Sequence, residues 1–180
     1  SKEGFDSWRQ DDSRHPQRRI ALALLQDYNF DLVVDLGCGK GAFTHLLKRK
    51  NNRVYALDGS RTALRAAKAR YPDIDFLRAD LGSPRKLDLL LRRIGKKIDL
   101  AFSSELFSYL KDWKGLLPVL AGHAERILIC LYIPDNPIGF VKSEAELAAE
   151  VEKHFEIVEW ASLRKSRDVV IFGKRKQSAL

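Results

Sequence analysis

The chain has 180 residues, a length that suits one domain. Its 45% hydrophobic content is enough to bury a core and excludes extended disorder, while a net charge of +8 is compatible with an anionic partner without requiring one. Two cysteines, Cys38 and Cys130, are too few for a disulfide scaffold or a four-cysteine zinc site, and no His, Cys, Asp or Glu spacing indicates a metal. We expect a cytoplasmic protein, because we find no signal segment and no membrane-length apolar run.

In the first half of the chain, helical patterns alternate with short apolar runs. The predicted elements are a helix over 16–28, a strand over 32–36, a helix over 41–50, a strand over 53–57, a helix from Ser60 to the residue before Pro72, and a strand over 74–78. The Ser60 hydroxyl is placed to cap its helix, and Pro72 ends it.

In the second half, Ser83 and Pro84 have the residue types of a helix start, and Gly95 those of a helix end. The further predicted elements are strands over 98–103 and 126–133 with a helix over about 113–121 between them, a helix from the capping box Ser143-x-x-Glu146 to Lys153, and two strands over 155–163 and 168–173.

Alternation of strands and helices predicts an α/β fold: one Rossmann-like, seven-stranded, mostly parallel sheet with helices on both faces. The last two strands lack a helix between them, so we expect a C-terminal antiparallel hairpin. Residues 16–180 are expected to form this domain, and residues 1–15 an N-terminal lid or arm. In such sheets the ligand lies beyond the carboxyl ends of the strands, where strand order reverses.

The most informative segment is VVDLGCGKGAF, in which a strand runs into Gly37-Cys38-Gly39-Lys40-Gly41 and then into a helix. Glycines permit a tight turn and close approach of a ligand to the backbone. Formally, Gly37, Gly39 and Ala42, with Asp58 further on, also satisfy the dinucleotide fingerprint, so a nicotinamide-dependent reductase is one alternative.

Three acids follow three strands in succession. Asp35 precedes the first glycine, Asp58 ends the second strand and Asp80 follows the third. The three carboxylates are therefore expected at one edge of the sheet. There Asp35 suits a cationic ligand, Asp58 can accept hydrogen bonds from the two hydroxyls of a ribose, and Asp80 can accept one from an exocyclic amine. The alternative is that all three only form turns and cap helices.

The segments VVDLGCGKGAF, VYALDGS and FLRADL resemble, in order and spacing, the motifs of class I S-adenosylmethionine-dependent methyltransferases. The resemblance covers about residues 16–175 and includes the final hairpin. It implies S-adenosylmethionine as cofactor, with the glycine loop under the methionine part, Asp58 at the ribose and Asp80 at adenine N6. The cofactor-binding set implied in full is Asp35, Gly37, Cys38, Gly39, Gly41, Asp58, Gly59, Asp80, Leu81 and Ser103.

Acceptor residues are expected after the fourth strand, where Glu105 and Tyr109 lie. The Asn/Asp-Pro-Pro-Tyr/Phe motif of nucleobase and glutamine methyltransferases is missing there, and SELFSYL is loosely similar to small-molecule enzymes, including the nodulation type. Glu105 could steer a cationic amine or act as a base, or it could cap the helix that follows. Tyr109 and Trp113 are more typical of core positions than of a pocket.

The N-terminal segment contains Trp8 and Arg9, which we interpret as substrate residues on a lid, and His15 is the histidine closest to that lid. The candidate catalytic residues are therefore Glu105, Tyr109 and His15. The other three histidines are expected to be structural.

The expected function is transfer of a methyl group from S-adenosylmethionine to nitrogen or oxygen of a small-molecule acceptor by in-line displacement. Two alternatives besides the reductase stay open. One is an RNA-directed methyltransferase that uses the basic surface, and the other is a non-catalytic subunit with a methyltransferase fold. Clusters of basic residues at 48–53, 85–97 and 163–176 are also explained by solvated helix faces and hairpin edges.

Overall fold

A computed structural model describes residues 15–95 and 97–177. It contains a seven-stranded sheet with the order β3-β2-β1-β4-β5-β7-β6. The strands are β1 Leu32–Leu36, β2 Arg53–Asp58, β3 Asp75–Arg78, β4 Ile98–Ser104, β5 Ala124–Tyr132, β6 Phe155–Leu163 and β7 Asp168–Arg175. Neighbours among β1 to β5 pair in parallel, whereas β7 pairs antiparallel with both β5 and β6. The predicted sheet and its C-terminal hairpin are confirmed.

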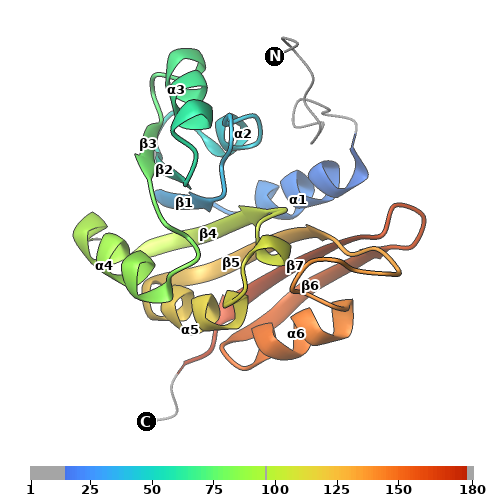
Figure 1. Ribbon diagram of the computed structural model, residues 1–180. Coiled ribbons are helices and arrows are strands. Elements are labelled where there is room, and N and C mark those ends of the chain that lie inside the picture. The colour runs from blue at the N-terminus through green and yellow to red at the C-terminus, as the bar shows by residue number, and fades with distance from the viewer. Residues whose placement is uncertain (1–14, 96, 178–180) are drawn as a thin grey trace.

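Helices cover both faces of the sheet (Figure 1). They are α1 Pro16–Gln26, α2 Thr44–Leu47, α3 Arg61–Arg70, α4 Pro84–Ile94, α5 Trp113–His123 and α6 Glu144–Glu152, and a short 3-10 helix, η1, spans Phe107–Tyr109. The first three helices lie on one face and the last three on the other (Figure 1). Each face therefore has its own apolar core.

Strand side chains alternate between these two cores. Val33 and Phe102 point to the core beneath α1 to α3, and Val34 and Ala101 to the core beneath α4 to α6. Trp113 is buried in the second core, as its expected structural role requires.

The predicted helix caps are present. The Ser60, Ser83 and Ser143 hydroxyls accept hydrogen bonds from the backbone three residues on, and Gly95 ends α4 with a φ of 71°. The capping box of α6 differs in one bond: the Glu146 carboxylate accepts from the Lys142 backbone N–H rather than from that of Ser143.

The helix predicted over 41–50 is shorter than expected, because α2 spans only Thr44–Leu47. Gly41 has a φ of 77°, which no helical residue adopts, so the helix starts later. Its end is set by Asn52, whose side-chain amide donates to the Leu47 carbonyl (2.9 Å) and accepts from the Arg49 N–H (2.8 Å). A side chain thus replaces the continuing helical bonds.

Strand order reverses between β1 and β4, and the ends of β1 to β5 meet at one edge of the sheet. Because β7 runs the opposite way, its first residue lies at this same edge, where Asp168 pairs in register with Tyr132, the last residue of β5. The edge is therefore bordered by the ends of five parallel strands and by the beginning of β7.

Candidate functional site

The glycine loop follows β1 and turns through left-handed backbone. Gly37, Gly39 and Gly41 have φ values of 80°, 53° and 77°. The Gly37 and Cys38 N–H groups both donate to the Leu57 carbonyl, at 2.8 and 3.1 Å, which fastens the loop to β2. A side chain at Gly41 would come within 3.0 Å of the Phe76 ring. All three positions favour glycine for backbone conformation, and Gly41 favours it for space as well.

Asp35 lies beneath this loop and is buried. Its carboxylate accepts a 2.5 Å hydrogen bond from the Thr44 hydroxyl. Burial raises the pKa of Asp35 to about 7, with a smaller upward contribution from Asp58, and the Thr44 bond opposes both. Asp35 thus supports the loop from below through Thr44. Its carboxyl gains or loses its proton near neutral pH.

Asp58 lies at the carboxyl end of β2, partly exposed and turned toward the glycine loop. One carboxylate oxygen accepts from the Gly39 N–H at 2.8 Å and the other from the Ser60 N–H at 2.7 Å. Each carboxylate oxygen can accept a second bond. Asp58 is therefore fixed in orientation and still able to bind two hydroxyls.

Asp80 lies at the end of the neighbouring β3. Its carboxylate accepts from the Lys86 ammonium at 2.7 Å and from the Gly82 N–H at 3.2 Å, and its pKa is held below the usual value, mainly by Lys86. The following Leu81 has its side chain in the core, which leaves its backbone for a ligand. Gly59 follows Asp58 directly and has no side chain to cover the same edge.

Two further predicted cofactor residues are buried. Cys38 is part of the core beneath α1 to α3, and burial raises the pKa of its thiol well above the usual range. Ser103 pairs in register with Leu36 near the end of β4, and its hydroxyl finds no hydrogen-bond partner among the residues described.

Glu105 follows β4 in the left-handed region, with a φ of 58°, although it is not glycine. Such backbone costs roughly 1–3 kcal/mol and persists where surrounding contacts fix it. Here its N–H donates to the Cys130 carbonyl at 2.9 Å, and its carboxylate accepts from the Gln17 side-chain amide at 3.0 Å and from the Tyr132 N–H at 3.1 Å. The carboxylate faces α1 and β5, so Glu105 does not cap the helix that follows.

Asp168 is a site residue that the sequence did not reveal. Its side chain is 3% exposed, and its Oδ2 has no hydrogen-bond partner among the described residues, with His15 Nε2 at 3.8 Å. Burial raises the pKa values of both Asp168 and Glu105, and the charge of Asp168 raises that of Glu105 further. The structure thus brings together His15 and Glu105, two of the candidate catalytic residues, with Asp168 and Gln17. We call these four residues the acceptor cluster.

Several apolar side chains near the acceptor cluster are exposed. These side chains are Tyr109, Tyr132, Ile138 and Phe140. Tyr109 is 56% exposed, so the core role considered for it is wrong, and the charge of Glu105 adds to burial in raising the pKa of its hydroxyl. Tyr132 and Asp168 are ladder partners, and such partners direct their side chains to the same face of a sheet.

The acceptor cluster adjoins the glycine loop. A side chain at Gly37 would lie 3.1 Å from Leu106, the residue after Glu105. Cys130 lies between them: burial raises the pKa of its thiol most, and the charges of Glu105, Asp168 and Asp35 raise that pKa further. Acids of the cluster and of the loop therefore both lie near this thiol. The loop and the cluster therefore lie side by side at this edge of the sheet.

The other histidines have structural surroundings, as expected. His45 stacks on Tyr71 with ring centroids 4.7 Å apart, and His123 contacts Asp88 at 2.8 Å. His154 donates its N–H to Val151 at the end of α6.

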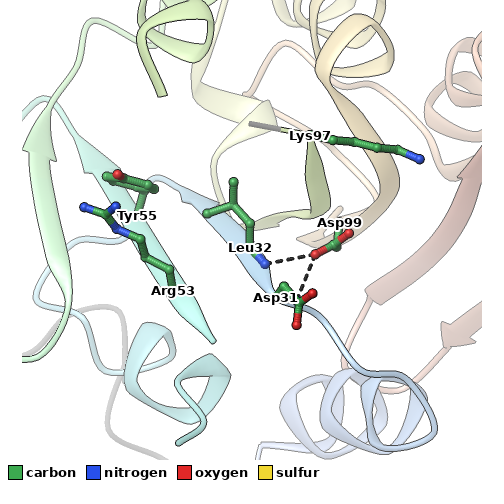
Figure 2. Close-up of a pocket in the computed structure, with 6 residues that line it drawn as sticks. All are labelled: Asp31, Leu32, Arg53, Tyr55, Lys97 and Asp99. Carbon is green, nitrogen blue, oxygen red and sulfur yellow. Dashed lines mark hydrogen bonds between the residues drawn. The ribbon is translucent and has the colours of Figure 1, made fainter. Parts of the chain in front are cut away.

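A hollow of about 300 Å³ lies at the opposite edge of the sheet, where β1, β2 and β4 begin (Figure 2). Asp99 there accepts from the backbone N–H groups of Asp31 and Leu32 (Figure 2), and the neighbouring Arg53 pairs with Asp75 at 2.8 Å. Its charged groups hold strands together, and it is remote from the glycine loop.

Within residues 15–95 and 97–177, no cluster of three or more His, Cys, Asp or Glu side chains could bind a metal ion. No helix in that part of the chain has the length and apolar character to span a membrane. Trp8, Arg9 and the predicted lid lie outside the described residues.

Several known proteins are similar to this chain in sequence and in fold. The methyltransferase-domain family matches residues 34–125, about half of the chain. Trans-aconitate 2-methyltransferase of Rhizobium leguminosarum bv. trifolii is 29% identical over 81% of this chain and 56% of its own length. Malonyl-[acyl-carrier protein] O-methyltransferase of Hamiltonella defensa is 35% identical over 56% of this chain and 38% of its own. The chain thus spans about half or less of these relatives.

Among solved structures, N-methyltransferase NodS from Bradyrhizobium japonicum superposes with a TM-score of 0.74. It is 16% identical, over 97% of this chain and 94% of that one, and was crystallised with S-adenosyl-L-homocysteine. The likeness shows a shared fold. With the family match, it identifies the class: the chain has the Rossmann-like fold of class I methyltransferases. It belongs to the S-adenosylmethionine-dependent methyltransferase-domain family.

Proposed function

We propose that this protein transfers a methyl group from S-adenosylmethionine to nitrogen or oxygen of a small-molecule acceptor. The observation that carries this proposal is Asp58, fixed by the Gly39 and Ser60 N–H groups while each of its oxygens can still accept a bond. It stands beside a loop whose glycines leave the backbone uncovered. This pairing suits a nucleoside with vicinal hydroxyls.

The residues present fit the cofactor. Asp58 would hold the ribose hydroxyls, and the backbone of Gly37 to Gly41 would lie against the methionine part, with Asp35 below it. Asp80, exposed beyond β3, and the backbone of Leu81 would meet the adenine. Asp80 is bound to Lys86, so its adenine contact would have to form beside, or replace, that ion pair.

The cofactor supplies a methyl group already activated on a positively charged sulfur. The remaining work of the protein is to align the acceptor and to exclude water. Alignment of this kind is worth roughly 7–11 kcal/mol in favourable cases. The position of Glu105 after β4, beside Leu106 and the glycine loop, supports a role for it at the acceptor.

The small-molecule class is supported by the names of relatives. Trans-aconitate appears in the name of the Rhizobium relative, and the fold of NodS, named as an N-methyltransferase, is shared. The basic clusters give less support to RNA, because many of their side chains are paired with acids. Such pairs include Lys86–Asp80, Arg92–Asp88, Lys97–Glu125, Arg167–Asp135 and Arg175–Glu125.

Calorimetry with S-adenosylhomocysteine tests the proposal. We expect the wild type to bind it, and Asp58→Ala and Gly39→Val to lose binding. Asp73→Ala, which removes an exposed acid before β3, serves as the matched control and should bind normally. Unchanged binding by Asp58→Ala would disprove the ribose assignment. Binding of NADH in place of S-adenosylhomocysteine would identify a reductase instead.

A further inference from the structure

We propose that the acceptor is an amine that arrives protonated, that Glu105 and Asp168 hold its ammonium group, and that Glu105 then accepts its proton. This inference rests on the proposed methyltransferase function and assigns a substrate class to the acceptor cluster. Asp168 is assigned a binding role and Glu105 a catalytic one.

The first support is the state of the Glu105 carboxylate. Its two oxygens accept one bond each, from Gln17 at 3.0 Å and from the Tyr132 N–H at 3.1 Å. These neutral donors fix the direction of the carboxylate without neutralising its charge. Each oxygen can accept one more bond.

The second, independent support is Asp168. Its carboxylate is almost fully buried, and Oδ2 lacks a hydrogen-bond partner among the described residues. The Ser166 side chain hydrogen-bonds to this carboxylate, and His15 Nε2, at 3.8 Å, is too far from Oδ2 for a hydrogen bond. A buried polar atom without a hydrogen bond is costly, so Oδ2 indicates a partner that completes it. The ladder partner of Asp168 is Tyr132, whose N–H donates to Glu105, so this oxygen belongs to the same cluster.

The charge balance of the cluster selects a cation. Burial raises the pKa values of Glu105 and Asp168, and among the described residues the chargeable base facing both is His15, partly exposed at 3.8 Å from Asp168. The other groups around them are the Gln17 amide, the Tyr109 hydroxyl, the Ser166 side chain, and Cys130, whose thiol also feels the charge of Arg18. A carboxylate acceptor would meet two like charges, whereas an ammonium ion would neutralise one.

The rim of the cluster suits the rest of such an acceptor. Tyr132 and Phe140 expose aromatic surface, and the Phe140 N–H is fixed to the Ser108 carbonyl at 2.8 Å. Aromatic faces attract cations and also cover an apolar body. We therefore expect an amine attached to an apolar group.

The proton step balances within the cluster. One N–H bond of the ammonium breaks and one O–H bond forms on Glu105, while the electron pair of the broken bond stays on nitrogen as the lone pair that a nucleophile needs. The elevated pKa of Glu105 favours acceptance of this proton. Asp168 takes no part in the proton step and holds the nitrogen in place.

A matched ligand series tests the charge preference without methyl transfer. Phenethylamine, phenethyl alcohol and hydrocinnamate have similar shapes and carry an ammonium, a hydroxyl and a carboxylate. In calorimetry at neutral pH with saturating S-adenosylhomocysteine, we expect the amine to bind about tenfold more tightly than the alcohol, the factor for one charge-assisted bond. Hydrocinnamate should bind most weakly.

Variants then test the two carboxylates. Glu105→Gln and Asp168→Asn keep shape and remove charge, and each should reduce the advantage of the amine over the alcohol to about threefold or less. Glu159→Gln, on the exposed part of β6, is the matched control and should keep the full preference. Because Glu105 takes the proton of the bound ammonium within the cluster, the enthalpy of amine binding by the wild type should be the same in two buffers of different ionisation enthalpy. A buffer-dependent enthalpy would show that the proton leaves to solvent and would overturn the role of Glu105 as its acceptor.

The outcomes separate this inference from the proposed function. If S-adenosylhomocysteine binds but the amine has no advantage over the alcohol or does not bind, the amine assignment is wrong and the methyltransferase function stands. If S-adenosylhomocysteine fails to bind, the proposed function is wrong. Retained S-adenosylhomocysteine binding by Asp168→Asn shows that this variant is folded, and a full amine preference in it would overturn the role of Asp168.

Discussion

At the scale of single residues, Asp35 shows how burial changes the role of an acid. The sequence suggested a carboxylate that faces a cationic ligand, and the structure places it under the loop with Thr44 as its partner. Its pKa of about 7 means that protonation of this group is coupled to folding. The folded state holds the proton more tightly than the unfolded chain, in which the pKa is near 3.8.

The sign of the resulting pH dependence follows. Between about pH 4 and pH 7 the unfolded chain releases the Asp35 proton and the folded protein retains it, so stability falls as pH rises through this window. From pH 5 to pH 8 the Asp35 contribution should fall by roughly 2–3 kcal/mol. Urea unfolding of the wild type and Asp35→Asn at both values measures it, since the variant should gain relative stability at pH 8. A difference that is constant with pH would contradict the assignment.

A substitution at Thr44 should lower stability at neutral pH, whereas Asp35→Asn should raise relative stability at pH 8. Thr44→Val removes the hydroxyl that donates to the carboxylate and retains a similar shape. We expect it to raise the pKa of Asp35 further and to destabilise the protein by about 1–3 kcal/mol at neutral pH, the cost of an unsatisfied buried group. The double variant with Asp35→Asn should recover part of that loss.

The acids that follow parallel strands could be located from the sequence. The acid that begins the antiparallel strand β7, Asp168, could not. Asp35, Asp58, Asp80 and Glu105 were found because each follows an apolar run. Asp168 was missed because it begins a strand, and only the reversed direction of β7 brings it to the same edge. The burial of its carboxylate is a property of tertiary packing that spacing does not encode.

At the scale of elements, local signals predicted most boundaries. The hydroxyl caps of α3, α4 and α6 and the left-handed Gly95 are where the sequence placed them. The exception is α2, where the side chain of Asn52, in the loop that follows, ends the helix earlier than apolar periodicity predicts. Hydrogen bonds from a loop to a helix end are not visible in periodicity.

Asn52 is therefore expected to stabilise the connection from α2 to β2. Asn52→Ala leaves the Leu47 carbonyl and the Arg49 N–H without their side-chain partners, and should destabilise the protein by about 1–3 kcal/mol. Asn51→Ala, at the adjacent exposed position, should change stability by less than about 0.5 kcal/mol. Equal effects of the two variants in thermal unfolding would refute the assigned role.

At the scale of the whole molecule, the predicted architecture is confirmed in strand number, direction and coverage of both faces. It could be predicted because alternating strands and helices leave few possible topologies. The acceptor half could not be predicted to the same extent. It is assembled from α1, the end of β4 and the hairpin, which are far apart in the sequence.

Cofactor binding should stabilise this whole unit. A ligand at 100 times its dissociation constant stabilises the native state by about 2.7 kcal/mol, which for a chain of this size corresponds to a rise in melting temperature of roughly 5–10 °C. We expect S-adenosylhomocysteine to produce such a rise in the wild type and none in Asp58→Ala. A similar rise in that variant would place the ligand elsewhere.

The placement of the two half-sites has a consequence for how this fold could diversify. The residues assigned to the methyl donor lie mostly within one stretch, from Asp35 to Leu81, whereas those facing the acceptor come from the start of α1, the turn after β4 and the first position of β7. Changes to His15, Glu105 or Asp168 could retune which molecule is modified while the donor stretch is inherited intact. New selectivity would then arise from a handful of positions scattered along the chain, on a scaffold whose donor stretch stays the same.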